Sequence, residues 1–176
     1  MITVQELEIP GVKLITLNRY NDRRGWINES WRDSWDEQVN LPDKFVQDML
    51  SWNDLPYTMR GLHGLSAPQY KLVSVVNGKV FDVVVDARPD SPTYKHHVTS
   101  VLSVYTPTMI LVPPGCFHGY LTLEPNTAVA YKVSHYHSAE LDLGINWADP
   151  ALDIKWPLYS NHAPTISKRD LNHPNL

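Results

Sequence analysis

The sequence predicts an all-β fold, a β-barrel or sandwich with short peripheral helices. Eight short runs rich in Val, Ile, Tyr and Trp alternate apolar and polar residues with a period of about two, as strands do. These runs cover residues 12–17, 25–31, 70–76, 79–87, 97–104, 108–113, 118–123 and 127–134. Fourteen prolines interrupt the chain without clustering, and many short strands broken by turn residues are typical of sandwiches and barrels. Helices are expected only near residues 34–39 and 150–152.

Length and composition predict one domain, residues 1–176, around one core. With 43% hydrophobic and 19% charged residues, the chain has the composition of an ordinary soluble protein. It has no apolar run near the roughly 20 residues that cross a bilayer, and its start, "MITVQELEIPG", lacks the pattern of a signal peptide. We therefore expect a cytoplasmic protein that binds no membrane.

Charge and cysteine content argue against a general nucleic-acid binder and against a protein with internal disulfides. A net charge of −4 argues against a general nucleic-acid binder, so any anionic ligand must be held by local arginines and lysines. The only cysteine, Cys116, cannot form a disulfide within the chain. It is expected to be a small buried apolar residue.

The dipeptide Asn77-Gly78 lies between two strand-like runs, which favours a two-residue hairpin turn. In that register Lys71 lies close to Asp82 and Asp86 on one face of the hairpin. Both faces are otherwise too apolar to meet water. We therefore expect the hairpin to be central, with these charged groups turned into an enclosed space or paired at its rim.

The segment "PPGCFHG" contains Pro-x-Gly-x-x-His, which ends in His118. A strand that ends in a Pro-Gly turn and resumes with an inward histidine resembles the second motif of cupin barrels. The expected fold is therefore a cupin-type jelly-roll β-barrel or sandwich, which also suits the number of strands. The corresponding first segment, "RGLHGL", offers His63 but no second histidine two residues later. A cupin metal site would therefore lack ligands here.

A second His-x-His pair leaves one alternative open. His135 and His137 would share a face on a strand, with Glu140 and Asp142 nearby. Together with His118 they could serve a metal-dependent cupin enzyme. A jelly roll that binds a sugar without catalysis is a further alternative.

Several ordered segments make the sequence similar to the dTDP-4-dehydrorhamnose 3,5-epimerase family, from about residue 9 to 170. They are "DRRGWINESW", "FVQD", "RGLHG" followed by "KLV", "VFDVVVDARPDSPTY", "VPPGCFHGYLTL", "YKVSHYH", "GINWADPALDIKWP" and "SKRD". The resemblance implies a jelly-roll homodimer without metal or organic cofactor. It also implies a nucleotide-linked 4-keto-6-deoxy sugar as substrate, epimerised through an enolate. A hairpin apolar on both faces and six tryptophans also favour a dimer.

The same resemblance assigns the reaction to four residues. His63 matches the proton acceptor, and Asp170 matches the carboxylate that orients its ring. Lys71 matches the cation beside the ketone oxygen, which stabilises the enolate. Tyr131 matches the proton donor on the opposite face of the sugar.

Other positions match substrate contacts. Cations for the diphosphate are supplied by arginines, which suit phosphate geometry. The matching positions are Arg24, Arg60 and Arg169 for the diphosphate, Glu29, Gln47, Asp48, His137 and Asp142 for the nucleotide, and His118 for a further hydrogen bond in the pocket.

In a strand with strict alternation, Arg60 and His63 would point to opposite faces. The resemblance, however, implies that both line one pocket. Gly61 between them permits a bulge that would re-aim one side chain. We therefore expect irregular pairing through residues 59–63.

The sequence departs from the family near the nucleotide and the sugar. The loop before Lys71 is shorter by about two residues, His137 stands where a tyrosine usually stacks on thymine, and Met49 replaces an asparagine. These departures suggest conserved chemistry with altered recognition. A C3-only or C5-only epimerase acting on a GDP- or CDP-linked sugar is therefore the close alternative.

Overall fold

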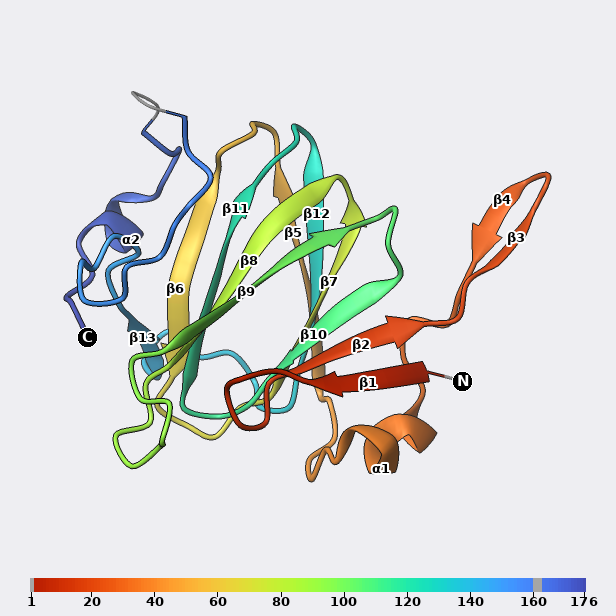
Figure 1. Cartoon of the computed structure of the whole chain (residues 1–176), viewed down its shortest axis with the longest axis horizontal. Coiled ribbons are helices and arrows are strands. Elements are labelled where there is room, and N and C mark those ends of the chain that lie inside the picture. Colours follow the sequence, from red (N-terminus) through yellow and green to blue (C-terminus); the bar gives the residue numbers. More distant parts are fainter. Residues whose placement is uncertain (1, 160–162) are drawn as a thin grey trace.

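Two antiparallel sheets face each other in the computed structural model of the chain, which describes residues 2–159 and 163–176 (Figure 1). One sheet has six strands in the order β1-β2-β10-β7-β12-β5, and the other has five in the order β13-β6-β11-β8-β9. The all-β prediction is confirmed. The strands of the first sheet are β1 (Ile2–Glu6), β2 (Lys13–Leu17), β5 (Gln47–Asn53), β7 (Lys71–Asn77), β10 (Thr108–Val112) and β12 (Thr127–Val133). Those of the second are β6 (Met59–Leu65), β8 (Lys79–Asp86), β9 (His97–Ser103), β11 (Cys116–Thr122) and β13 (Asp142–Gly144).

The main core lies between the two sheets, where inward side chains of both meet. Cys116 belongs to it and is buried, as predicted. Each Val or Ile buried here stabilises the fold by about 1.5–3 kcal/mol. The buried members are Ile9, Val12, Val73, Val75, Val80, Val84, Val98, Leu102, Ile110, Val112, Cys116, Tyr120 and Val129.

Two smaller clusters cover the outer faces of the sheets. The predicted helix near residues 34–39 exists as a 3-10 turn, η1 (Asp33–Trp35), followed by α1 (Asp36–Val39). Trp35 and Val39 pack there on the outer side of the six-stranded sheet. On the other sheet, residues 145–156 and the end of the chain cover β6, β8 and β11.

The helix expected at residues 150–152 is absent, because the chain turns only once there. Leu152 N–H donates to the Asp149 carbonyl, but Asp153 then adopts a left-handed φ of 48°, which ends the turn. The second helix is instead α2 (Lys168–Leu171), whose first turn is capped by the Ser167 side chain accepting from Asp170 N–H. No helix among the described residues is long and apolar enough to cross a membrane.

The prediction that β7 and β8 pair as a hairpin is wrong, but the prediction of which side chains face the interior is correct. Strand β7 pairs with β10 and β12, whereas β8 pairs with β9 and β11 in the other sheet. Asn77-Gly78 therefore turns the chain from one sheet to the other. The face that carries Lys71 and Asp82 does line the interior, but these two residues have different partners.

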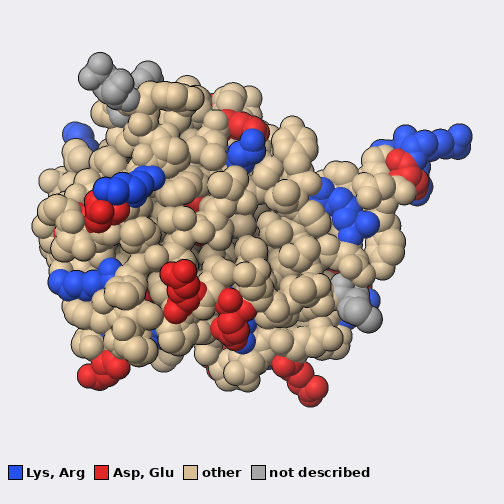
Figure 2. Space-filling view, in the orientation of Figure 1, with Lys and Arg blue, Asp and Glu red and all other residues tan. Residues whose placement is uncertain are grey.

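A narrow two-stranded arm projects from the body of the molecule (Figure 1). It consists of β3 (Tyr20–Asp22) and β4 (Gly25–Ile27), and Tyr20, Trp26 and Ile27 in it are at least half exposed. Of the strand predicted at residues 25–31, only the first three residues form one, as β4. Basic side chains crowd its tip, while charges elsewhere on this face are scattered (Figure 2).

Candidate active site

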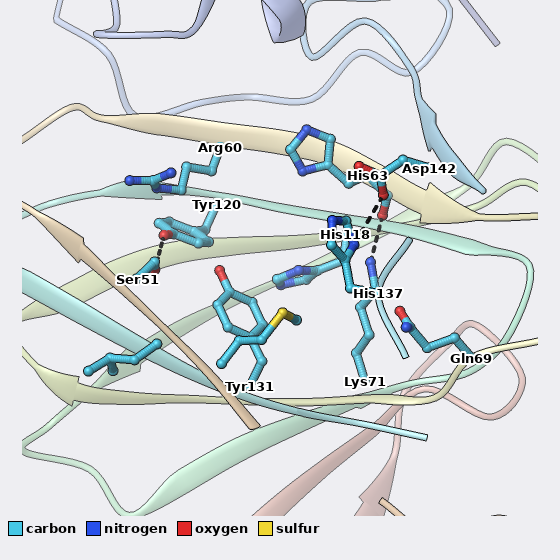
Figure 3. A pocket seen from close by; sticks show the side chains of 12 residues that line it. Ser51, Arg60, His63, Gln69, Lys71, His118, Tyr120, Tyr131, His137 and Asp142 are labelled. Atoms are coloured by element: carbon cyan, nitrogen blue, oxygen red, sulfur yellow. Dashed lines mark hydrogen bonds and ion pairs between the residues drawn. The ribbon is translucent and has the colours of Figure 1, made fainter. Parts of the chain in front are cut away.

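A cavity of about 280 Å³ opens between the two sheets near one end of the barrel. Side chains of both sheets reach it (Figure 3). Its lining is made by Met49, Leu50, Ser51, Arg60, His63, Gln69, Lys71, His118, Tyr120, Tyr131, His137 and Asp142. The proposed base, cation and proton donor therefore face one space, as the resemblance implied.

An irregularity in β6 brings Arg60 and His63 to this cavity together. His63 lies opposite His118 and Arg60 opposite Tyr120, so the register shifts between the two pairs. Gly61, with φ of 119°, lies within the shift. The predicted bulge is confirmed, and Arg60 is fixed at the rim by donating to the Asn53 side chain (2.8 Å).

We expect Gly61→Ala to destabilise the protein by several kcal/mol. An added Cβ would lie 2.6 Å from Gly119 Cα and 2.8 Å from the His118 carbonyl oxygen, and neither backbone atom can move freely. Gly25→Ala is the matched control, because Gly25 has a similar φ of 124° but open space around it. Urea denaturation should show a loss for Gly25→Ala of only about 1–2 kcal/mol; equal losses would contradict the steric argument.

His63 and Asp170 form a direct pair across the cavity wall. His63 Nε2 lies 3.0 Å from Asp170 Oδ1, and Gly61 N–H donates to Asp170 Oδ2 (3.1 Å). Burial raises the pKa of Asp170, but these hydrogen bonds and that from the Ser167 side chain outweigh burial and hold it at about 2. The carboxylate is thus charged at any working pH, and it orients the imidazole.

Lys71 reaches the cavity from β7, in the opposite sheet. Its Nζ donates to the His63 carbonyl oxygen (3.1 Å). Burial lowers the pKa of Lys71 to about 8, although the negative charge of Asp142 opposes this. At neutral pH the ammonium group is a partly buried positive charge, and no carboxylate within residues 2–159 and 163–176 forms an ion pair with it. It is a suitable partner for a substrate oxyanion.

Tyr131 enters from β12 and lies near Tyr120 and Ser51 (Figure 3). Burial raises the pKa of Tyr131 well above the usual value, and the neighbouring Tyr120 adds to this. Ser51 Oγ and the Tyr120 hydroxyl lie 2.8 Å apart. The phenol is therefore a neutral donor beside a chain of hydroxyl groups.

His118 is held by a partner that the sequence placed elsewhere. Its Nε2 lies 2.8 Å from Asp82 Oδ2, and both side chains are buried. Asp82 was expected near Lys71. The strand alternation correctly put Asp82 inside, but its neighbour depends on β8 pairing with β11.

The rim of the cavity is a polar network around Asp142. Arg169 Nη2 lies 2.8 Å from Asp142 Oδ2, and His137 Nδ1 lies 3.7 Å from Asp142 Oδ1. The Gln47 side chain accepts from His137 N–H (2.8 Å). These four residues were all assigned to substrate contacts, and the structure brings them together at the entrance.

Three assigned residues lie away from the cavity in a single chain. Arg24 is at the tip of the arm, paired with Asp22, and Glu29 follows the arm and pairs with Arg32. Asp48 points to the outer face of β5, where it pairs with Lys132. Alternation along β5 sends Met49 to the cavity instead.

One residue near the base was missed by the sequence argument. His173 Nε2 lies 3.6 Å from the same Asp170 Oδ1 that contacts His63. Within residues 2–159 and 163–176, one group of three His, Cys, Asp or Glu side chains is close enough together to share a metal ion. It consists of His63, Asp170 and His173. The metal alternative built on His118 with His135 and His137 has no such cluster among them.

The fold and the cavity define a class, a jelly-roll enzyme with a paired histidine, a lysine and a tyrosine arranged for acid–base chemistry. Residues 6–176 match the family model of dTDP-4-dehydrorhamnose 3,5-epimerase. The chain belongs to the dTDP-4-dehydrorhamnose 3,5-epimerase family.

Individual relatives agree with this assignment. A dTDP-4-dehydrorhamnose 3,5-epimerase of Sinorhizobium fredii is 39% identical over 98% of this chain and 88% of its own length. The crystal structure of the Bacillus anthracis enzyme, with TDP and pyrophosphate bound, is 39% identical over the whole of both chains, with a TM-score of 0.94. A dTDP-6-deoxy-D-glucose-3,5-epimerase from Legionella pneumophila, in complex with dTDP-4-keto-L-rhamnose, is 34% identical over 99% of this chain and 93% of that chain, with a TM-score of 0.94. The predicted family, jelly-roll fold and epimerase class are confirmed.

Proposed function

We propose that the chain epimerises C3 and C5 of a dTDP-linked 4-keto-6-deoxy sugar, with His63 as base and Tyr131 as acid. One observation carries this assignment: His63 and Tyr131 belong to opposing sheets and line the same cavity. A planar enolate held between the sheets can then lose a proton to one side and gain one from the other. Relatives of known structure bind TDP and dTDP-4-keto-L-rhamnose, which favours thymidine as the nucleoside.

His63 acts through its second nitrogen. Its Nε2 is engaged with Asp170, so Nδ1 is the atom left to take a proton from a sugar carbon next to the ketone. The C–H electron pair moves into the C4 carbonyl, giving an enolate oxygen and an imidazolium. The charged Asp170 stabilises that imidazolium as it forms.

Lys71 stabilises the enolate oxygen. A fixed positive charge in an enclosed site acts strongly where charge develops, and removing one such group commonly costs about 3–4 kcal/mol of transition-state stabilisation. Tyr131 then donates its hydroxyl proton to the opposite face of the carbon, which inverts it. Solvent protons restore the tyrosine, and the imidazolium loses its proton to solvent.

The charge of Lys71 sets an alkaline limit to activity. Because burial lowers its pKa to about 8, the ammonium group is present below that pH and lost above it. We expect kcat/KM to fall about tenfold per pH unit above about pH 8. Initial rates from about pH 6 to 10 would check this result.

Lys71→Arg is the matched variant for that limit. A guanidinium stays charged across this range, so the alkaline limb should flatten while the maximum falls because the cation sits differently. An unchanged limb in Lys71→Arg would assign the titration to another group.

Arg24 and Glu29, which lie outside the cavity in a single chain, favour a second copy of the chain at the site. The arm presents exposed Tyr20, Trp26 and Ile27 and carries Arg24 at its tip. We infer a homodimer in which this arm packs on the partner and brings Arg24 and Glu29 to the partner's cavity. Arg60 at the rim would supply the cation from the same chain.

Mixed dimers test this arrangement. Arg24→Ala and His63→Ala proteins should each be nearly inactive, but unfolding and refolding them together should restore about a quarter of wild-type activity, since half the dimers would hold one intact site. If Arg24 serves its own chain, mixing should restore none. Sedimentation of the wild-type protein gives the oligomeric state.

The function itself is tested with 4-keto-6-deoxy sugars linked to dTDP, GDP and CDP, incubated in D₂O. The proposal expects deuterium at both C3 and C5 of the dTDP sugar, with inversion at both, by NMR and mass spectrometry. Deuterium at one carbon only would favour the single-epimerase alternative. No exchange into any of the sugars would contradict the proposal.

Two expectations from the sequence stay predictions. They are the single domain of residues 1–176 and the cytoplasmic location. One calorimetric unfolding transition, the same by circular dichroism and fluorescence, would support the first.

A further inference from the structure

His173 lies where it can act on the catalytic pair without touching the substrate. It follows α2, and its N–H donates to the Asp170 carbonyl (3.5 Å). Three residues apart, the two side chains lie on one face of the helical turn. His173 does not line the cavity.

Two imidazoles converge on one carboxylate oxygen. Asp170 Oδ1 lies 3.0 Å from His63 Nε2 and 3.6 Å from His173 Nε2. In the described part of the chain, the buried His173 Nε2 has no hydrogen-bond partner. A small rotation would let it donate to Oδ1, which can accept two hydrogen bonds.

The ring of His173 also restrains the ring of His63. The centroids lie 5.7 Å apart with an interplanar angle of 86°, an edge-to-face contact. This contact opposes rotation of the His63 imidazole away from the plane in which Nε2 meets Asp170.

The space for His173 is provided by a glycine directly across from the base. Gly144 on β13 pairs with His63 on β6. A methyl group on Gly144 would overlap the His173 ring, and the backbone of Gly144 does not need a glycine, because its φ is not positive. The residue after His173 is also held in place, because the Pro174 carbonyl accepts a hydrogen bond from Asn146 N–H (2.7 Å).

The charge state of His173 suits this role. Burial lowers its pKa, and the proximity of His63 and Arg169 adds to this, although Asp170 and Asp142 oppose it. A neutral imidazole can donate from Nε2 without placing a second positive charge beside the base.

We infer that His173 is a positioning residue for epimerisation, holding Asp170 and the His63 ring in the geometry that proton abstraction requires. The inference rests on the proposed function. Loss of His173 should leave substrate binding intact but slow the chemical step, because small errors in the placement of a base reduce rate strongly.

Four variants test the inference through kcat and KM, with melting temperatures as a control for folding. His173→Ala should lower kcat about tenfold and change KM less than about twofold. His173→Gln keeps an N–H donor and should recover most of the loss. His96→Ala, which removes an exposed histidine, should match the wild type.

Gly144→Ala provides an independent displacement of the ring. It should lower kcat about as much as His173→Ala does, and the double variant should lose less than about twofold more, because both changes remove one interaction. Gly144→Ala and His173→Gln keep the test valid if His173→Ala does not fold.

Deuterium exchange in the wild-type protein separates this inference from the proposed function. If the wild type exchanges no substrate hydrogen, the proposed function fails. If it does, but His173→Ala retains wild-type kcat, or Gly144→Ala and His173→Ala add independently, the positioning role alone is overturned.

Discussion

His63→Ala is expected to lower kcat about 10³- to 10⁴-fold, because it removes the base that starts both inversions. Asp170 would keep its charge but lose the ring it orients. Substrate should still bind, since the cations and the rim are untouched. Product formation followed by chromatography, with substrate binding measured by calorimetry, would show the two effects separately.

Two controls sharpen this result. His137→Ala removes an imidazole from the rim of the same cavity, so it should raise KM with little loss of kcat. Free imidazole should partly restore His63→Ala by filling the space left beside Asp170. Epimerisation at a near wild-type rate by His63→Ala would refute His63 as the base.

The alternation of side chains along each strand could be predicted because it depends only on neighbouring residues. Lys71 and Asp82 were both placed inside, and both are there. Their partners were wrong, since Lys71 meets the His63 carbonyl and Asp82 meets His118. Which strands pair is decided by contacts far apart in the sequence, which alternation does not reveal.

The turn at Asn77-Gly78 shows how a correct local signal can mislead. Gly78 has a φ of 76°, as a tight turn requires. However, Asn77 lies opposite Ala128 on β12, and its side chain donates to the Asn126 carbonyl (2.6 Å). The turn therefore directs β8 into the second sheet rather than back along β7.

The prediction of the site residues from sequence was limited for a similar reason. Motifs located His63, Lys71, Tyr131 and Asp170, which the fold gathers from four separate segments. They gave no sign of His173, because its place depends on a gap left by Gly144 on another strand. Motifs also cannot tell which copy of the chain uses the arm.

Tyr131→Phe is expected to reduce inversion strongly while leaving hydrogen exchange at the substrate carbon. Without the phenol, no group replaces the proton on the far face of the enolate, so net epimerisation should fall about 10²- to 10⁴-fold. His63 would still remove the proton, exchange it with solvent and return it to the same face. In D₂O, therefore, the substrate should gain deuterium without changing configuration.

This outcome depends on the phenol being neutral. Burial raises the pKa of Tyr131, so the wild-type residue carries its proton throughout the pH range in which Lys71 is charged, and the enolate is basic enough to take it. Tyr120→Phe is the matched control, because it removes a nearby hydroxyl that is bonded to Ser51 yet leaves the proposed donor in place. That variant should retain inversion at a reduced rate. If Tyr131→Phe instead lost exchange and inversion together, Tyr131 would act before the enolate forms, and the division of roles between the two sheets would be incorrect.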